Sequence, residues 1–221
     1  WPDPDVYVNY MGQSLSGSEN RNINRTYPGK ADGTLTEMMS YGIVQLINTE
    51  NIDVTVDLHE ASPEYPVINA LIAHERAMNL ASNVVVDMQM EGVQISLEPS
   101  PTDLRGLTHR ELGDHTDTLA LLMEAPNPAQ GRLRDRTDEA LVLTGKSETY
   151  VKAGEIGQLY VPYDENGWPI EVRCARHVFG IERILANYSE MYEEPIIVTG
   201  MPSYDELVKN GMGPYLNEPT T

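Results

Sequence analysis

Apolar and polar residues follow one another along this chain in blocks that predict strands and helices in turn. Short runs rich in β-branched and other apolar residues predict strands, whereas apolar spacings of three and four predict helices. The predicted strands are residues 6–8, 54–58, 67–73, 93–97 and 119–123. Strands that alternate with helices indicate an α/β fold with a mixed, largely parallel sheet.

Three helices are predicted. The first begins after Thr34 or Thr36, either of which can cap it, and the second covers residues 75–88. The third spans roughly residues 170–190. The first helix carries apolar residues on one side at a spacing of 3.6 residues per turn, namely Met38, Met39, Ile43, Leu46 and Ile47. The third repeats apolar residues at steps of three or four, namely Ile170, Cys174, Val178, Ile181, Leu185 and Tyr188.

The 221 residues are enough for one ordinary domain with a real hydrophobic core. We expect residues 1–192 to form this domain and the Pro- and acid-rich residues 193–221 to form a C-terminal tail. Within the domain, residues 12–33 predict a polar loop. Residues 130–165 mix charges, glycines and short apolar pieces, which indicates an insertion or an irregular arm.

Composition excludes some classes of protein. An apolar share of 40 % and a charged share of 22 % argue against disorder. The net charge of −19 repels phosphate backbones and anionic lipids, so neither nucleic acid nor a membrane surface is an expected partner. No apolar run reaches about 18 residues, so no membrane span is expected. Cys174 is the single cysteine, which excludes an internal disulfide and a thiolate zinc site.

The chain begins at Trp1 with neither a basic region nor an apolar signal segment after it. We therefore expect a processed or cleaved product, which slightly favours a periplasmic or extracellular location.

Three places along the sequence carry candidate chemistry. The strand at 54–58 leads into Asp57-Leu58-His59, which places an imidazole at the carboxyl edge of a sheet, where α/β folds bind their ligands. Asn24 and Arg25 stand together in the polar loop, and arginine suits bidentate recognition of a carboxylate. Glu124 ends an apolar strand, where a carboxylate is costly unless it has a partner or a chemical role.

These motifs, in this order, resemble the zinc carboxypeptidase superfamily. The loop reads Asn22-Ile23-Asn24-Arg25-Thr26-Tyr27-Pro28-Gly29, His59 follows Arg25 by 34 positions, and Glu124 follows His59 by 65. The loop looks closest to the succinylglutamate desuccinylase/aspartoacylase-like branch. The resemblance covers residues 6–128 best and implies a three-layer α/β/α fold, with the helix at 170–190 as the closing helix.

The resemblance also implies a role for each matching residue. His59 would be a zinc ligand, and Glu124 would be the general base that moves a proton from water to the leaving amine. Asn24 and Arg25 would bind the substrate carboxylate, which is a peptide C-terminus or an N-acyl amino acid. Arg110 would be a further substrate-binding residue, although an ordinary exposed arginine is an equal alternative. Asp57 orients the site or is structural.

The chain departs from the family in its histidines. The superfamily takes two further zinc ligands from a His-x-x-Glu motif upstream of the Asn-Arg loop, but all five histidines here lie downstream of that loop. Local hydrogen bonding or substrate contact is expected for His109 and His115, and packing or surface exposure for His177. The sequence thus supplies one inferred zinc ligand, where a catalytic site needs three.

Two hypotheses follow. In the first, a companion N-terminal fragment or chain supplies the missing His and Glu, and together the two form a zinc-dependent hydrolase. In the second, the metal has been lost and the chain is a degenerate carboxypeptidase-like domain with a binding or structural role. Retention of Asn24, Arg25, His59 and Glu124 together favours the first hypothesis.

Overall fold

The computed structural model describes residues 21–134 and 136–216. Its four strands are β1 (Val54–Ala61), β2 (Ala70–Ala73), β3 (Ser96–Pro99) and β4 (Leu119–Pro126). Its α-helices are α1 (Leu35–Glu50), α2 (Met78–Met90), α3 (Thr108–His115), α4 (Glu139–Thr144), α5 (Glu148–Glu155), α6 (Ile170–Tyr192) and α7 (Tyr204–Asn210). Short 3₁₀ helices are η2 (Ile23–Arg25), η3 (Glu75–Ala77), η4 (Pro128–Gln130) and η5 (Gly213–Tyr215). The predicted strand at 6–8 lies outside the described residues.

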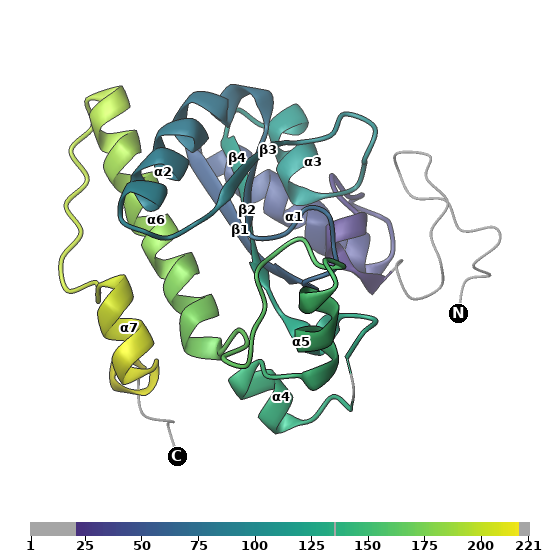
Figure 1. The fold of residues 1–221 in the computed structure, drawn as a ribbon. Coiled ribbons are helices and arrows are strands. Elements are labelled where there is room, and N and C mark those ends of the chain that lie inside the picture. Colours follow the sequence, from purple (N-terminus) through teal and green to yellow (C-terminus); the bar gives the residue numbers. More distant parts are fainter. Residues whose placement is uncertain (1–20, 135, 217–221) are drawn as a thin grey trace, which may run out of the picture. The chain divides into compact units, whose positions relative to one another are not determined.

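The strands form one sheet in the order β1-β4-β2-β3, flanked by helices (Figure 1). Hydrogen bonds beside the first and the last residues of β1 and β4 join them in the same order, from Leu119 N to Asp53 O and from Asn127 N to Ala61 O. These two strands are therefore parallel. β2 and β3 are parallel by the same criterion. The prediction of an α/β protein with a mixed, largely parallel sheet is confirmed.

The chain divides into two compact units, each of which is described by itself. The first unit takes the chain up to Asp57, together with Ile72–Asn79 and Glu98–Leu122. The second unit takes Leu58–Leu71, Leu80–Leu97 and the chain from Met123 onwards.

The core of the first unit packs α1 against the Asn-Arg loop, α3 and the start of β4. Its buried cluster consists of Tyr27, Val44, Ile47, Leu112 and Ala120. Thr34 caps α1 in a capping box with Glu37, as the sequence predicts for this threonine. The apolar residues predicted to share one side of this helix do not share one environment, because Ile47 is buried whereas Met38, Met39 and Leu46 are 42 %, 52 % and 57 % exposed.

The core of the second unit packs α6 against α2 and the end of β4. The buried residues of α2 recur at helical spacing, as Leu80, Ala81, Val84, Val85 and Met88. A glycine brings α6 close to the sheet, because a Cβ at Gly180 would lie 2.2 Å from the end of the Met123 side chain. α7 lies alongside α6 (Figure 1), where the Tyr204 ring contacts Phe179 and Leu207 is fully buried.

The element boundaries differ from the predicted ones in detail. The strand predicted at 67–73 is shorter, the one predicted at 93–97 begins later at Ser96, and the run at 119–123 continues to Pro126. The predicted helices at 75–88 and 170–190 correspond to η3 with α2 and to α6. Residues 130–165 contain α4 and α5, joined by irregular chain. No helix in the described part of the chain is long and apolar enough to cross a membrane.

Candidate functional site

His59 and Glu124 face each other in the second unit. His59 lies on β1 and Glu124 on the adjacent parallel strand β4. His59 Nδ1 lies 3.8 Å from Glu124 Oε1, with the two side chains 29 % and 13 % exposed. At this distance the two side chains form an ion pair only when the imidazole is protonated, and they are too far apart for a regular hydrogen bond. The two residues that the sequence analysis pairs as zinc ligand and general base thus lie close together.

His177 of α6 lies close to His59 and Glu60. Burial lowers the pKa of the His177 imidazole, while the charge of Glu60 and the nearby backbone of His59 act to raise it. Neither ring nitrogen has a hydrogen-bond partner in the described part of the chain. The sequence suggests only packing or surface exposure for His177. His177 lies three residues after Cys174 and four before Ile181, which places it on the apolar face of α6. This spacing is the sequence feature that indicates its burial.

A buried ionic network holds the strand ends that carry His59 and Glu124. Arg173 of α6, which is 1 % exposed, donates to Glu60 Oε1 at 2.5 Å and to the carbonyls of Trp168 and Val142. Asn127 Nδ2 donates to the other oxygen of Glu60 at 2.7 Å. Because Glu60 directly follows His59, and Asn127 lies three residues beyond Glu124, the network fixes the ends of both strands. Sequence analysis did not identify this network.

The Asn-Arg loop is anchored in the first unit. Asn24, which is buried, accepts a hydrogen bond at its side-chain oxygen from the Thr108 backbone N–H at 2.7 Å. The Thr108 hydroxyl in turn donates to Asp57 Oδ2 at 2.5 Å. Arg25 donates through Nη1 to the Asn24 carbonyl at 2.6 Å. Asn24 thus acts as an anchor that links the loop to α3 and β1, and this contact gives Asp57 a structural partner.

Arg110 lies in an ion-pair network of the first unit. Its guanidinium donates to both oxygens of Glu75, at 2.8 and 2.7 Å, and to Asp114 at 2.7 Å. The hydrogen bond from Arg110 lowers the pKa of Glu75 to about 2. Burial raises the pKa of Asp114, but hydrogen bonds from Arg110, His74 and Arg105 outweigh it and hold this pKa well below its usual range. The Arg110 side chain is 3 % exposed, so binding a substrate carboxylate would require it to exchange one of these partners.

The remaining histidines of the first unit have polar neighbours. His109 Nδ1 lies 2.7 Å from the Ser100 hydroxyl, and His115 Nε2 lies 3.3 Å from Glu111. His74 Nε2 lies 3.1 Å from Asp114. The contacts of His109 and His115 are of the local kind expected from the sequence, but both residues lie in α3 and not in the polar loop that the sequence suggests.

The described residues do not by themselves fit a zinc ion. They contain no group of three or more His, Cys, Asp or Glu side chains that could hold a metal. A catalytic zinc site requires three protein ligands, and His59 is the one ligand that the resemblance assigns to this chain.

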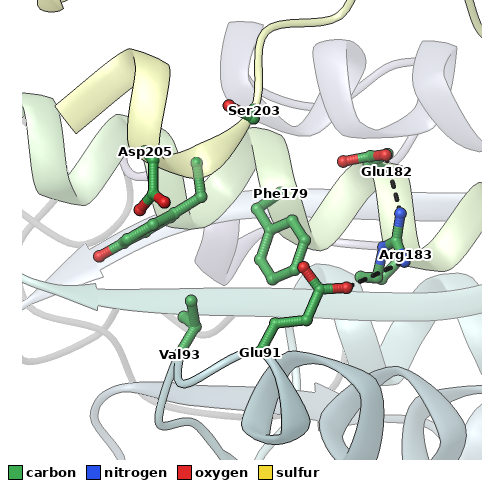
Figure 2. A pocket seen from close by; sticks show the side chains of 8 residues that line it. Glu91, Val93, Phe179, Glu182, Arg183, Ser203 and Asp205 are labelled. Carbon is green, nitrogen blue, oxygen red and sulfur yellow. Dashed lines mark hydrogen bonds and ion pairs between the residues drawn. The ribbon is translucent and has the colours of Figure 1, made fainter. Parts of the chain in front are cut away.

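Two pockets of the second unit lie on α6. The smaller, with a volume of about 190 Å³, is shown in Figure 2. The Arg183 guanidinium lies over the Phe179 ring, 5.3 Å from its centre. It also pairs with Glu182 at 2.7 Å and with Glu91 at 3.4 Å, so these two carboxylates are already paired with a cation of the same pocket. The larger, of about 620 Å³, includes Trp168 with the Arg176 guanidinium 5.5 Å from its ring centre.

Comparison with known proteins adds no relative, since no family model, curated protein or solved structure matches this chain. The resemblance therefore depends on the motifs of the chain itself.

Proposed function

We propose that this chain is part of a zinc-dependent hydrolase of amide or peptide bonds adjacent to a carboxylate, of the metallocarboxypeptidase or N-acyl amino acid deacylase type. A separate N-terminal segment would complete its metal site. The fold proposed with this function is the three-layer α/β/α arrangement of the zinc carboxypeptidases. The observation that carries the proposal is the 3.8 Å approach of His59 and Glu124 on adjacent strands.

The chain's own residues have separable roles in this proposal. The Glu124 carboxylate accepts a proton from the attacking water and returns it to the leaving nitrogen. His59 contributes an imidazole beside that carboxylate. Arg25 binds the substrate carboxylate, and Asn24, anchored on Thr108, holds the loop that carries Arg25. Orientation of this kind supplies part of the rate enhancement of such enzymes.

A second candidate is favoured by the lack of a three-ligand group in the described residues. In it the chain is a metal-free domain that keeps the carboxypeptidase-like fold and serves in binding or assembly. The two candidates differ in metal content and in turnover.

The test is metal analysis and assay of the protein isolated from its own cells, beside recombinant residues 1–221. The substrates are a panel of N-acyl amino acids and short peptides with free and amidated C-termini. We expect the native protein to contain stoichiometric zinc and to hydrolyse the substrates that have a free carboxylate. Residues 1–221 alone should show neither property. Tight zinc on residues 1–221 would show that the ligands are local, and its absence from both forms would favour the metal-free domain.

A further inference from the structure

The larger pocket of the second unit, of about 620 Å³, has a buried cation in its lining. Arg176 of α6 is 5 % exposed. Its Nη2 donates to the side-chain oxygen of Asn69 and to the carbonyl of Gln94, and its guanidinium also hydrogen-bonds to the Tyr204 side chain. Each of these partners is uncharged at neutral pH. Within residues 21–134 and 136–216, Arg176 therefore has polar contacts but no carboxylate partner.

The lack of an anion at Arg176 is unusual for a buried arginine. A charge taken out of water loses its hydration, so buried charges are normally paired. Two other arginines are buried in the described part of the chain, and both have carboxylate partners: Arg173 pairs with Glu60, and Arg110 with Glu75. Burial lowers the pKa of the Arg176 guanidinium, as expected for a cation without a compensating anion. The pocket beside Arg176 is where an anionic group can reach it.

The same pocket has aromatic walls that the fold holds in place. Its lining includes Tyr163, Trp168 and Tyr204. Trp168 Nε1 donates to the Pro162 carbonyl at 3.1 Å, and the Tyr163 hydroxyl donates to the Gly145 carbonyl at 2.5 Å. The Arg176 guanidinium lies 5.5 Å from the centre of the Trp168 ring, so the cation and an aromatic surface are neighbours. This arrangement suits a ligand that carries an anionic group and an apolar group.

Two carboxylates also line the pocket and narrow the class of ligand. Glu155 is the last residue of α5, and Asp164 lies in the loop that follows; both side chains are exposed. The C-terminal end of a helix carries a partial negative charge, which adds to the charge of Glu155. These groups repel a ligand that is only anionic and attract a protonated amine. The lining thus offers one buried cation, two exposed carboxylates and aromatic rings.

We propose that this pocket binds a zwitterion, namely a free amino acid with an aromatic or large apolar side chain. The ligand carboxylate pairs with Arg176, its ammonium group with Glu155 and Asp164, and its side chain packs on the aromatic rings. Pockets for small molecules measure about 300–1,000 Å³, a range that includes this one. A free amino acid has no net charge, so the net charge of −19 does not oppose its entry. The proposal goes beyond the proposed function, because neither His59 nor Glu124 lines the pocket.

The experiment is isothermal titration calorimetry of the protein produced in its own cells, with L-phenylalanine and L-leucine as probes. We expect at least one of them to bind with a stoichiometry of one. 2-Phenylethylamine lacks the carboxylate of phenylalanine, and 3-phenylpropionate lacks its ammonium group. Loss of a hydrogen bond to a charged group weakens binding by roughly 10–100-fold, which we expect for 2-phenylethylamine. Loss of the contacts with exposed carboxylates should weaken binding of 3-phenylpropionate by roughly two- to fivefold.

Variants of the lining residues locate the ligand. Arg176→Gln should weaken binding of L-phenylalanine by roughly 10–100-fold, and the double variant Glu155→Gln, Asp164→Asn by roughly two- to fivefold. Glu165→Gln is the matched control, because Glu165 is exposed next to Asp164 but does not line the pocket. If Arg176→Gln does not fold, the comparison with 2-phenylethylamine tests the same contact in the unaltered protein.

Several outcomes would overturn the proposal. The first is a Kd above about 10 mM for both amino acids. Equal affinity for L-phenylalanine and 2-phenylethylamine would exclude a carboxylate contact with Arg176, and tighter binding of 3-phenylpropionate would indicate a site for anions instead of zwitterions. Binding lost in Arg25→Ala and kept in Arg176→Gln would place the ligand in the proposed active site. Equal effects of Glu165→Gln and the double variant would reduce the carboxylates to a general effect of charge.

Discussion

At the scale of single residues, Glu124 is the group whose proposed role is most specific. Glu124→Gln keeps the size of the side chain and removes its ability to take a proton. We expect kcat of the native, metal-containing enzyme to fall by roughly 10²–10⁴ with zinc content unchanged. Glu50→Gln, an exposed glutamate at the end of α1, is the matched control. Loss of zinc in the Glu124 variant would instead indicate that Glu124 is a zinc ligand.

Arg25 is assigned to substrate binding, so its variant should behave differently. A hydrogen bond to a charged group contributes about 1.5–3 kcal/mol, so Arg25→Ala should raise KM for free carboxylates by roughly 10–100-fold. The matching amidated substrates should be almost unaffected. Equal losses on both kinds of substrate would contradict the assignment.

Arg110 leads to a prediction about stability and pH. Arg110→Gln removes a buried guanidinium and leaves the partly exposed carboxylates of Glu75 and Asp114 without their ionic partner, so we expect a loss of about 1–3 kcal/mol in the free energy of unfolding at pH 7. The exposure of Glu75 places the loss towards the lower value. Denaturant titrations of both proteins measure it.

The pH dependence has a definite sign. Arg110 holds the folded-state pKa of Glu75 at about 2, below its ordinary value of 4.5. A carboxyl group whose pKa is lowered by folding stabilises the folded state at pH values above its unfolded-state pKa. This contribution is lost as pH falls towards the folded-state pKa of about 2. The difference in the free energy of unfolding between wild type and Arg110→Gln should therefore become smaller as pH falls from 4.5 to 2. A difference that widens in acid would contradict this account.

At the scale of secondary-structure elements, two helix glycines give opposite predictions for the same substitution. Gly42→Ala places its methyl group in open space and gains helix propensity, so we expect stabilisation by about 0.5–1 kcal/mol. At Gly113 of α3 a Cβ would lie 2.2 Å from the His74 ring, which is buried. Gly113→Ala should therefore cost about 1–3 kcal/mol. Thermal unfolding of the two variants measures both effects, and equal shifts would contradict the packing at α3.

Sequence patterns predicted most elements but not the faces that they bury. The periodicity of α1 groups Met38, Met39 and Leu46 with Ile47, yet only Ile47 of these four is buried. A hydrophobic pattern records what is apolar and not which neighbour covers it. The site shows the same limit. Short apolar strands predicted His59 and Glu124 at the carboxyl ends of neighbouring strands. Arg173 and His177, more than 110 residues after His59, are brought to Glu60 and His59 by α6. The spacing along α6 indicates which face is buried but not which strand that face covers.

At the scale of the whole molecule, we expect the net charge to determine how stability depends on salt. A net charge of −19 destabilises a compact state by self-repulsion, and added salt screens that repulsion. Salt also weakens exposed ion pairs, but these contribute little individually. We expect Tm of residues 1–221 to rise by about 2–4 °C between low salt and 0.5 M NaCl, corresponding to about 1 kcal/mol. A fall in Tm over this range would show that ion pairs outweigh repulsion.

The order of the strands also sets the time at which β1 finds a partner. β1 ends at Ala61, whereas β4, its neighbour in the sheet, begins at Leu119. At a synthesis rate of about 5–20 residues per second, β4 leaves the ribosome roughly 3–12 s after β1. During that interval β1 lacks the one neighbour that it has in the described part of the sheet, and unpaired strand edges promote aggregation. A strand translated earlier, or a chaperone that binds extended apolar segments, would shorten the time for which β1 is unpaired. The yield of soluble protein should therefore rise when either is present during translation of residues 61–119.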